Sequence, residues 1–136
     1  MQRAVLISAL AALMLLASCN AQRQPAPRSL CAFESGPCRG GFDGSDVSLQ
    51  ITPAPPHAMS ELAFIVKATE GVEPYMIDLI MPGMQMGLNR VPLSRGEDGS
   101  YTGKGVIPRC PSGGNLWRAE VMMKSGRVVG FDFEVR

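Results

Sequence analysis

The chain has few of the residues from which most enzyme and zinc sites are built. Its 136 residues include one histidine, His57, and no GxGxxG, P-loop or HExxH pattern. The formal net charge is +1, with 13 basic and 12 acidic side chains, so no positive excess points to a nucleic acid or another polyanion. These absences exclude most histidine-based catalysis and zinc binding, and we expect neither an enzyme nor a nucleic-acid-binding protein.

Long apolar runs are also absent, apart from one at the N-terminus. Residues 4–17 are almost entirely apolar and follow the positively charged Arg3. The run is too short to span a membrane comfortably, and a cationic start before a short apolar stretch is typical of a secretory signal. Its ending, residues 16–19 (LASC), resembles the lipobox of bacterial lipoproteins. The resemblance implies cleavage before Cys19, acylation of its thiol and attachment to an envelope membrane.

This hypothesis divides the chain into three parts. Residues 1–18 are the predicted signal peptide, and residues 19–45 are a lipid-bearing, cysteine-containing segment whose polar, proline-bearing start suits a tether. Residues 46–136 are the predicted folded domain. Asn20 stands where an aspartate is associated with inner-membrane retention, so we expect an outer-membrane anchor that faces the periplasm.

The four cysteines constrain the covalent structure. If Cys19 carries lipid, Cys31, Cys38 and Cys110 remain in an oxidising compartment, and three thiols allow one disulfide and one free thiol. The short separation of Cys31 and Cys38 favours a disulfide between them, with Cys110 left free. A disulfide between Cys38 and Cys110 would close a longer loop and stays open as the alternative.

Glycine and proline, by contrast, are frequent, with 15 and 11 residues, and they indicate many turns. Apolar and polar residues alternate most clearly in the last two predicted strands, near the C-terminal end of the chain. From Tyr75 to Met81, every second residue is expected to face the core. About seven short strands at this spacing predict an all-β fold, a two-sheet antiparallel sandwich. The predicted strands are 47–51, 62–67, 75–81, a stretch ending near Leu93, 101–107, 117–123 and 129–135.

One segment, residues 81–87 (MPGMQMG), carries three methionines around a Pro-Gly turn. Thioether sulfur is a soft ligand that suits Cu(I), and it forms no disulfides in an oxidising compartment. Met84 and Met86 are two residues apart, so in an extended segment they project to the same side. Met81 continues an apolar strand face and is expected in the core. Ordinary packing is the more frequent use of methionine, and it stays open for Met84 and Met86 as well.

Two further residues are candidates to complete a metal site. Cys110 lies in the loop 108–114, and as a thiolate it would be a strong soft ligand. A disulfide is the alternative role for this cysteine. His57 and Met59 have the His-x-Met spacing found in some copper sites, although a lone histidine in a proline-bounded loop usually has no specific role.

The order of short motifs in the second half of the chain resembles that of a known family. Residues 84–87 (MQMG) are followed by 99–103 (GSYTG), by 114–117 (GNLW) and by a last strand, 131–135 (FDFEV). This order is similar to that of the YtkA-like and FixH-like group of small bacterial envelope domains, over about residues 46–136. The resemblance implies an immunoglobulin-like sandwich and a link to copper handling or cytochrome oxidase assembly. Met84 and Met86 match its suspected metal-contacting segment, but no histidine follows them, and the cysteines are not part of the pattern.

These observations leave two hypotheses of different classes. In the first, the protein is a lipid-anchored periplasmic copper chaperone or buffer that binds Cu(I) through Met84, Met86 and Cys110. In the second, it is a lipoprotein without metal that binds a protein partner, and the methionines form an adaptable apolar contact surface. In both, the lipid at Cys19 holds the domain at a membrane.

Overall fold

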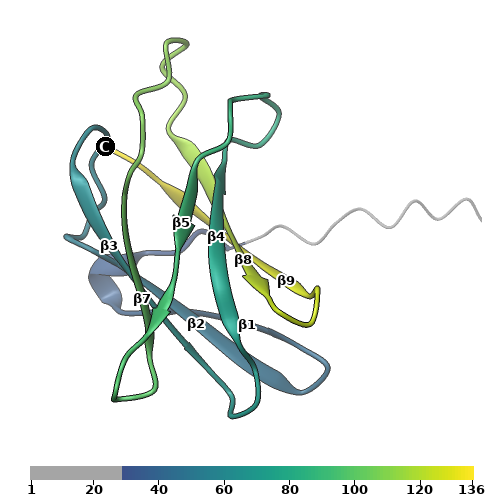
Figure 1. Ribbon diagram of the computed structural model, residues 1–136. Coiled ribbons are helices and arrows are strands. Elements are labelled where there is room, and N and C mark those ends of the chain that lie inside the picture. Colours follow the sequence, from purple (N-terminus) through teal and green to yellow (C-terminus); the bar gives the residue numbers. More distant parts are fainter. Residues whose placement is uncertain (1–28) are drawn as a thin grey trace, which may run out of the picture.

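The computed structural model describes residues 29–136, and in this range the protein is an all-β sandwich of two antiparallel sheets (Figure 1). One sheet has the strand order β1-β2-β3-β7-β6, and the other has the order β5-β4-β8-β9. The predicted signal peptide, Cys19 and the first part of the predicted tether lie outside the described residues. The strands are β1 (Cys38–Phe42), β2 (Ser45–Thr52), β3 (Glu61–Ala68), β4 (Pro74–Ile80), β5 (Arg90–Pro92), β6 (Ser94–Arg95), β7 (Tyr101–Val106), β8 (Leu116–Met123) and β9 (Val128–Glu134).

The clearest alternation in the sequence becomes the β8–β9 hairpin. In β8, Trp117 and every second residue after it are buried, while the residues between them are partly exposed. The register pairs Trp117 with Phe133, so the apolar side chains of the two strands enter the core together. The core between the sheets also holds large side chains of the opposite sheet, such as Phe64 of β3. The prediction of an all-β sandwich is therefore confirmed.

One detail of the predicted pattern is wrong. Tyr75 was expected to face the core, but 39% of its surface is exposed, while Ile77, Leu79 and Met81 are buried. The pairing of β4 with β8 shifts between Pro74 and Met76. An irregularity of this kind inserts one extra residue and changes the face to which the preceding side chains point.

The sandwich contains nine strands in the described range, whereas about seven were expected. One of the additional strands, β1, pairs with β2 and precedes residue 46, so the packed structure includes part of the cysteine-containing segment, residues 19–45, that was predicted to precede the folded domain. A Cβ atom added at Gly40 would stand 2.8 Å from Val129 Cγ1. Glycine at this position therefore allows β1 to lie close against β9. Just before β1, a 3₁₀ turn places the ring of Phe33 5.5 Å from that of Phe133.

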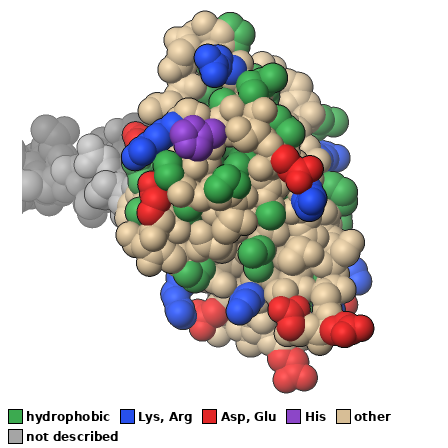
Figure 2. Space-filling view, turned by 90° about the vertical axis from the view of Figure 1, so that its left-hand side faces the viewer, with side chains coloured by type: hydrophobic (Ala, Val, Ile, Leu, Met, Phe, Trp, Pro, Cys, Tyr) green, Lys and Arg blue, Asp and Glu red, His purple; other side chains and the backbone are tan. Residues whose placement is uncertain are grey.

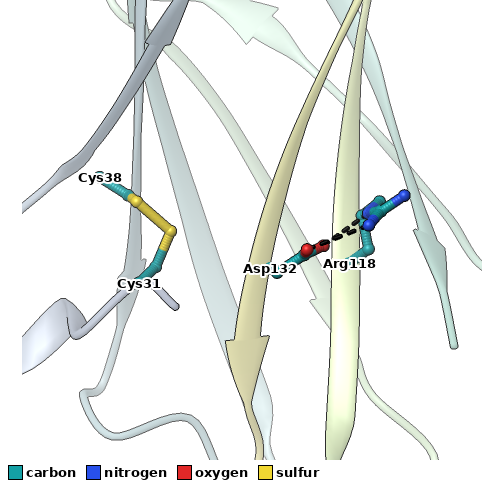
Figure 3. The surroundings of a disulfide bond; sticks show 4 residues. All are labelled: Cys31, Cys38, Arg118 and Asp132. Carbon is teal, nitrogen blue, oxygen red and sulfur yellow. Dashed lines mark hydrogen bonds and ion pairs between the residues drawn. A yellow bond between two sulfur atoms is a disulfide. The ribbon is translucent and has the colours of Figure 1, made fainter. Parts of the chain in front are cut away.

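A disulfide joins Cys31 and Cys38 (Figure 3), the pairing that their short separation favoured. Cys110 is a free cysteine. Near this disulfide, on β8 and β9, Arg118 donates from Nε and Nη2 to the two carboxylate oxygens of Asp132, at 2.5 and 3.0 Å (Figure 3).

Within residues 29–136, no helix has the length and apolar character needed to cross a membrane.

Three loops form the end of the sandwich drawn uppermost in Figure 1: residues 53–60, 81–89 and 107–115. The backbone holds this upper end together, because Met59 N–H donates to Ile107 O and Ala58 N–H to Arg136 O, each at 2.8 Å. The predicted copper ligands all lie in the loops of this upper end.

Candidate functional site: a sulfur cluster at the upper end

Two of the predicted ligands, Cys110 and Met84, meet at the upper end although 26 residues separate them in sequence. Cys110 Sγ lies 3.8 Å from Met84 Sδ. Ser112 Oγ lies 2.9 Å from Cys110 Sγ and 3.6 Å from Met84 Sδ, so its hydroxyl bridges the two sulfur atoms. The three side chains form one compact group, which we call the sulfur cluster.

Local turn chemistry positions both sulfur atoms. Met84 closes a turn over residues 81–84, in which its N–H donates to Met81 O at 3.1 Å and Gly83 has a φ of 82°. Proline followed by glycine with positive φ is the signature of a type II turn. On the other loop, residues 110–113 form a second turn, with a 3.0 Å hydrogen bond from Gly113 N–H to Cys110 O. Each ligand therefore stands at the end of a tight, proline-containing turn.

The environment of Cys110 favours its ionised form. The hydroxyl of Ser112 is the largest influence and lowers the pKa of the Cys110 thiol below its ordinary value of 9.0. The backbone amides of Ser112, Gly114 and Gly113 lower the pKa further, while burial of the side chain opposes the shift. The thiolate is the form of cysteine that binds metals, so the lowered pKa makes Cys110 a better metal ligand.

A third sulfur atom, that of Met81, borders the same volume. A Cβ atom added at Gly114 would stand 3.3 Å from Met81 Sδ and 3.8 Å from Cys110 Sγ. The absence of a side chain at Gly114 thus lets both sulfur atoms approach one point. Met81 is buried, as expected for a core residue, and its sulfur also borders the space beside Gly114 that Cys110 Sγ borders. The alternation of the sequence identified only the packing role.

Met86 lies elsewhere. It packs against the core and lines a cavity of about 430 Å³ whose lining includes neither Met84 nor Cys110. The expectation that Met84 and Met86 project to one side assumed an extended strand, but no strand is formed between β4 and β5. The structure therefore brings Met84 to Cys110 and places Met86 beside Met59 and Trp117.

His57, the remaining candidate, is not part of the sulfur cluster. His57 is exposed in the loop before β3, and no hydrogen bond or ion pair links it to the sulfur cluster. Among the described residues, no three side chains of His, Cys, Asp or Glu gather in one place. Of the predicted ligands, the described residues bring together the sulfur atoms of Cys110 and Met84, with the hydroxyl of Ser112 beside them.

The spacing of the sulfur atoms is suited to a soft metal ion. For metal–sulfur bonds of about 2.3 Å, a separation of 3.8 Å between Cys110 Sγ and Met84 Sδ gives an S–metal–S angle of about 110°. Such an angle fits a three- or four-coordinate ion.

The chain matches no protein-family model, no curated protein and no solved structure. Its function must therefore be inferred from the chemistry of this cluster.

Proposed function

We propose that the protein is a lipid-anchored periplasmic lipoprotein that binds Cu(I) through Cys110 and Met84, and that it serves as a copper chaperone or buffer. The observation that carries the proposal is the 3.8 Å separation of Cys110 Sγ and Met84 Sδ. The lipobox-like sequence ending at Cys19 supplies the membrane anchor in this proposal.

The chemistry of the donors favours Cu(I) over other ions. Thiolate and thioether sulfur are soft ligands, whereas Mg²⁺ and Ca²⁺ require oxygen. Structural zinc sites have four ligands drawn from cysteine, histidine and carboxylates, and the described residues gather no such set. Met81 Sδ is available as a third sulfur atom at the inner side of the cluster.

Copper binding would change the hydrogen bonds of Cys110. In the metal-free protein the Cys110 thiol donates towards Met84 Sδ. A metal ion bound between these two atoms takes the place of that proton. Ser112 then donates its hydroxyl hydrogen to the thiolate sulfur, which stabilises the charged ligand.

The exposure of the ligands supports exchange of the metal. Cys110 is buried, but 43% of the surface of Met84 is exposed. An incoming or outgoing ligand can therefore approach the metal from the side of Met84, while Cys110 holds it from within. This arrangement suits a chaperone or buffer, which must release its copper as well as bind it.

Anaerobic titration with Cu(I), in competition with a chromogenic chelator, tests the proposal. The wild-type protein is expected to bind one Cu(I) ion tightly. Cys110→Ser and Met84→Leu should each weaken binding strongly, because each removes one of the two sulfur atoms that meet at 3.8 Å. Met86→Leu is the matched control, since Met86 lines a separate cavity, and it should bind copper as the wild type does.

Two outcomes would refute this ligand set. Equal and weak binding by the wild type and by Cys110→Ser would show that no specific site exists. A loss of affinity in Met86→Leu as large as that in Met84→Leu would show that the two methionines act together in a way that the structure does not contain.

A lipoprotein that binds a protein partner without metal is the second candidate. The cavity next to Met86 is bordered by exposed apolar side chains, Met59 and Leu88 among them, and an exposed apolar surface is a common feature of protein interfaces. Cross-linking in cells with the protein at its native level would count against this candidate if it recovered no partner.

A further inference from the structure

Exposed apolar side chains are concentrated at the upper end of the sandwich. The lower end of the sandwich is formed by the turns 43–44, 69–73, 96–100 and 124–127 (Figure 1). Eight large hydrophobic residues of the described range are exposed, and only Tyr75 and Val128 belong to the lower end. Leu30 lies at the side, where the described chain begins. The other five belong to the upper end, in its loops or at the adjoining strand ends: Met59, Met84, Leu88, Val106 and Leu116. The two most exposed are Leu88, at 79%, and Met59, at 66%.

The loops of the upper end carry few charges. The three loops contain no aspartate or glutamate, and their only lysine or arginine is Arg109. The turns of the lower end carry five acidic residues, Asp43, Glu70, Glu73, Glu97 and Asp98, and two basic ones, Lys124 and Arg127, and side chains of both signs lie at the bottom of Figure 2. Lys124 and Arg127 form ion pairs with Glu73 and Asp43. The upper-end loops therefore present less negative charge to an anionic surface than the lower-end turns do, and the nearest acidic residues, Glu61 and Glu134, stand at the adjoining strand ends.

The described chain begins at the side of the sandwich, below the loops of the upper end (Figure 1). There Leu30 and Cys31 line a cleft with Pro55 and Pro56, from the base of the upper end, and with Glu34, Glu134 and Arg136. Ten residue steps separate Cys19 from Ser29, and a chain of that length spans at most about 35 Å. A lipid at Cys19 would therefore keep the domain close enough to the membrane for the upper end to touch it.

We infer that the upper end rests on the phospholipid surface, with Leu88, Met59 and Val106 entering the interfacial region and Arg109 facing the lipid phosphates. Apolar side chains gain from burial at the boundary of headgroups and acyl chains, and a basic side chain gains from the negative surface potential. The inference rests on the lipid anchor of the proposed function but not on copper.

Depth-dependent fluorescence quenching tests this orientation. The full lipidated protein, free of metal, is reconstituted into liposomes of phosphatidylethanolamine and phosphatidylglycerol with brominated acyl chains. Leu88→Trp reports on the upper end, and Val128→Trp, at an exposed apolar position of the lower end, is the matched control. The signal of the buried Trp117 is subtracted with the parent protein. Trp at position 88 is expected to be quenched about twofold or more relative to Trp at position 128, because the interfacial region is about 5–10 Å deep.

A second pair of changes separates insertion from mere proximity. Met59→Ser and Arg109→Glu, each added to Leu88→Trp, should reduce the quenching if the apolar and basic side chains hold the end on the lipid. Equal quenching at positions 88 and 128 would overturn the inference. So would an unmodified Cys19 in the mass spectrum of the membrane-extracted protein, or a photo-cross-link from position 88 to an envelope protein without quenching by lipid. Copper binding can fail in its own titration without changing any of these results.

Discussion

Binding of Cu(I) should depend on pH in a way that identifies the cysteine ligand. The thiol of Cys110 is the only group of the sulfur cluster whose proton a metal ion must displace, because thioethers carry none and the Ser112 hydroxyl keeps its own. The perturbation is therefore a change of pH, applied to the wild type and to Cys110→Ser.

The magnitude follows from the release of one proton. While the thiol is protonated in the metal-free protein, the apparent affinity for Cu(I) should rise about tenfold for each pH unit. The dependence should level off as the pH passes the pKa of Cys110, which hydrogen bonds from Ser112 and the loop amides hold below its ordinary value of 9.0. In Ser112→Ala the pKa should be higher, so the same plateau should begin at higher pH.

Chelator competition under anaerobic conditions, from about pH 5.5 upward, measures this dependence, and the pH profile of thiol alkylation in the metal-free protein locates the pKa independently. A flat affinity in the wild type over this range would refute the reasoning, because a site built from methionine alone releases no proton. An equal slope in Cys110→Ser would refute it too, since the titrating group would then lie elsewhere.

Two further predictions concern the scaffold. Replacing both Cys31 and Cys38 with serine should lower the free energy of unfolding by about 2.5 kcal/mol in a urea titration, the loop-closure value for a sequence separation of 7, and no measurable change would contradict the disulfide. Arg118→Met removes the two hydrogen bonds that Arg118 donates to the partly buried Asp132 and should cost about 2 kcal/mol, whereas Lys104→Met, which removes an exposed ion pair with Glu61, should cost under about 0.5 kcal/mol. An equal loss of unfolding free energy in Arg118→Met and Lys104→Met would show that burial does not strengthen the Arg118–Asp132 pair.

The sandwich could be predicted because apolar and polar residues alternate along its inner strands, in step with buried and exposed positions. The alternation around Trp117 and Phe133 follows from one face of each strand meeting the core. The same argument fails for β1, because the sequence Cys38-Arg39-Gly40-Gly41-Phe42 has no such alternation. Its place is set instead by pairing with β2 and by the close approach that Gly40 permits. Neither this pairing nor the packing of β1 against β9 produces a periodic pattern in the sequence.

The sulfur cluster could be predicted only in part. The residue types and the two turn loops were visible, and the soft character of sulfur followed from them. The distance between Met84 and Cys110 could not be derived, since it depends on which loops meet at one end of the sandwich. Met86 was grouped with Met84 on the assumption of extended backbone, and the irregular loop removes the basis for that grouping. Met81 was assigned to the core alone because a buried ligand and a packing residue have the same sequence pattern.

X-ray absorption at the copper edge of the Cu(I)-loaded protein reports the ligand atoms themselves. We expect two or three sulfur atoms at about 2.3 Å from copper, without nitrogen or oxygen, and one sulfur atom fewer in Met84→Leu. Nitrogen or oxygen bound to the copper, or a sulfur count that Met84→Leu leaves unchanged, would contradict binding through Cys110 and Met84.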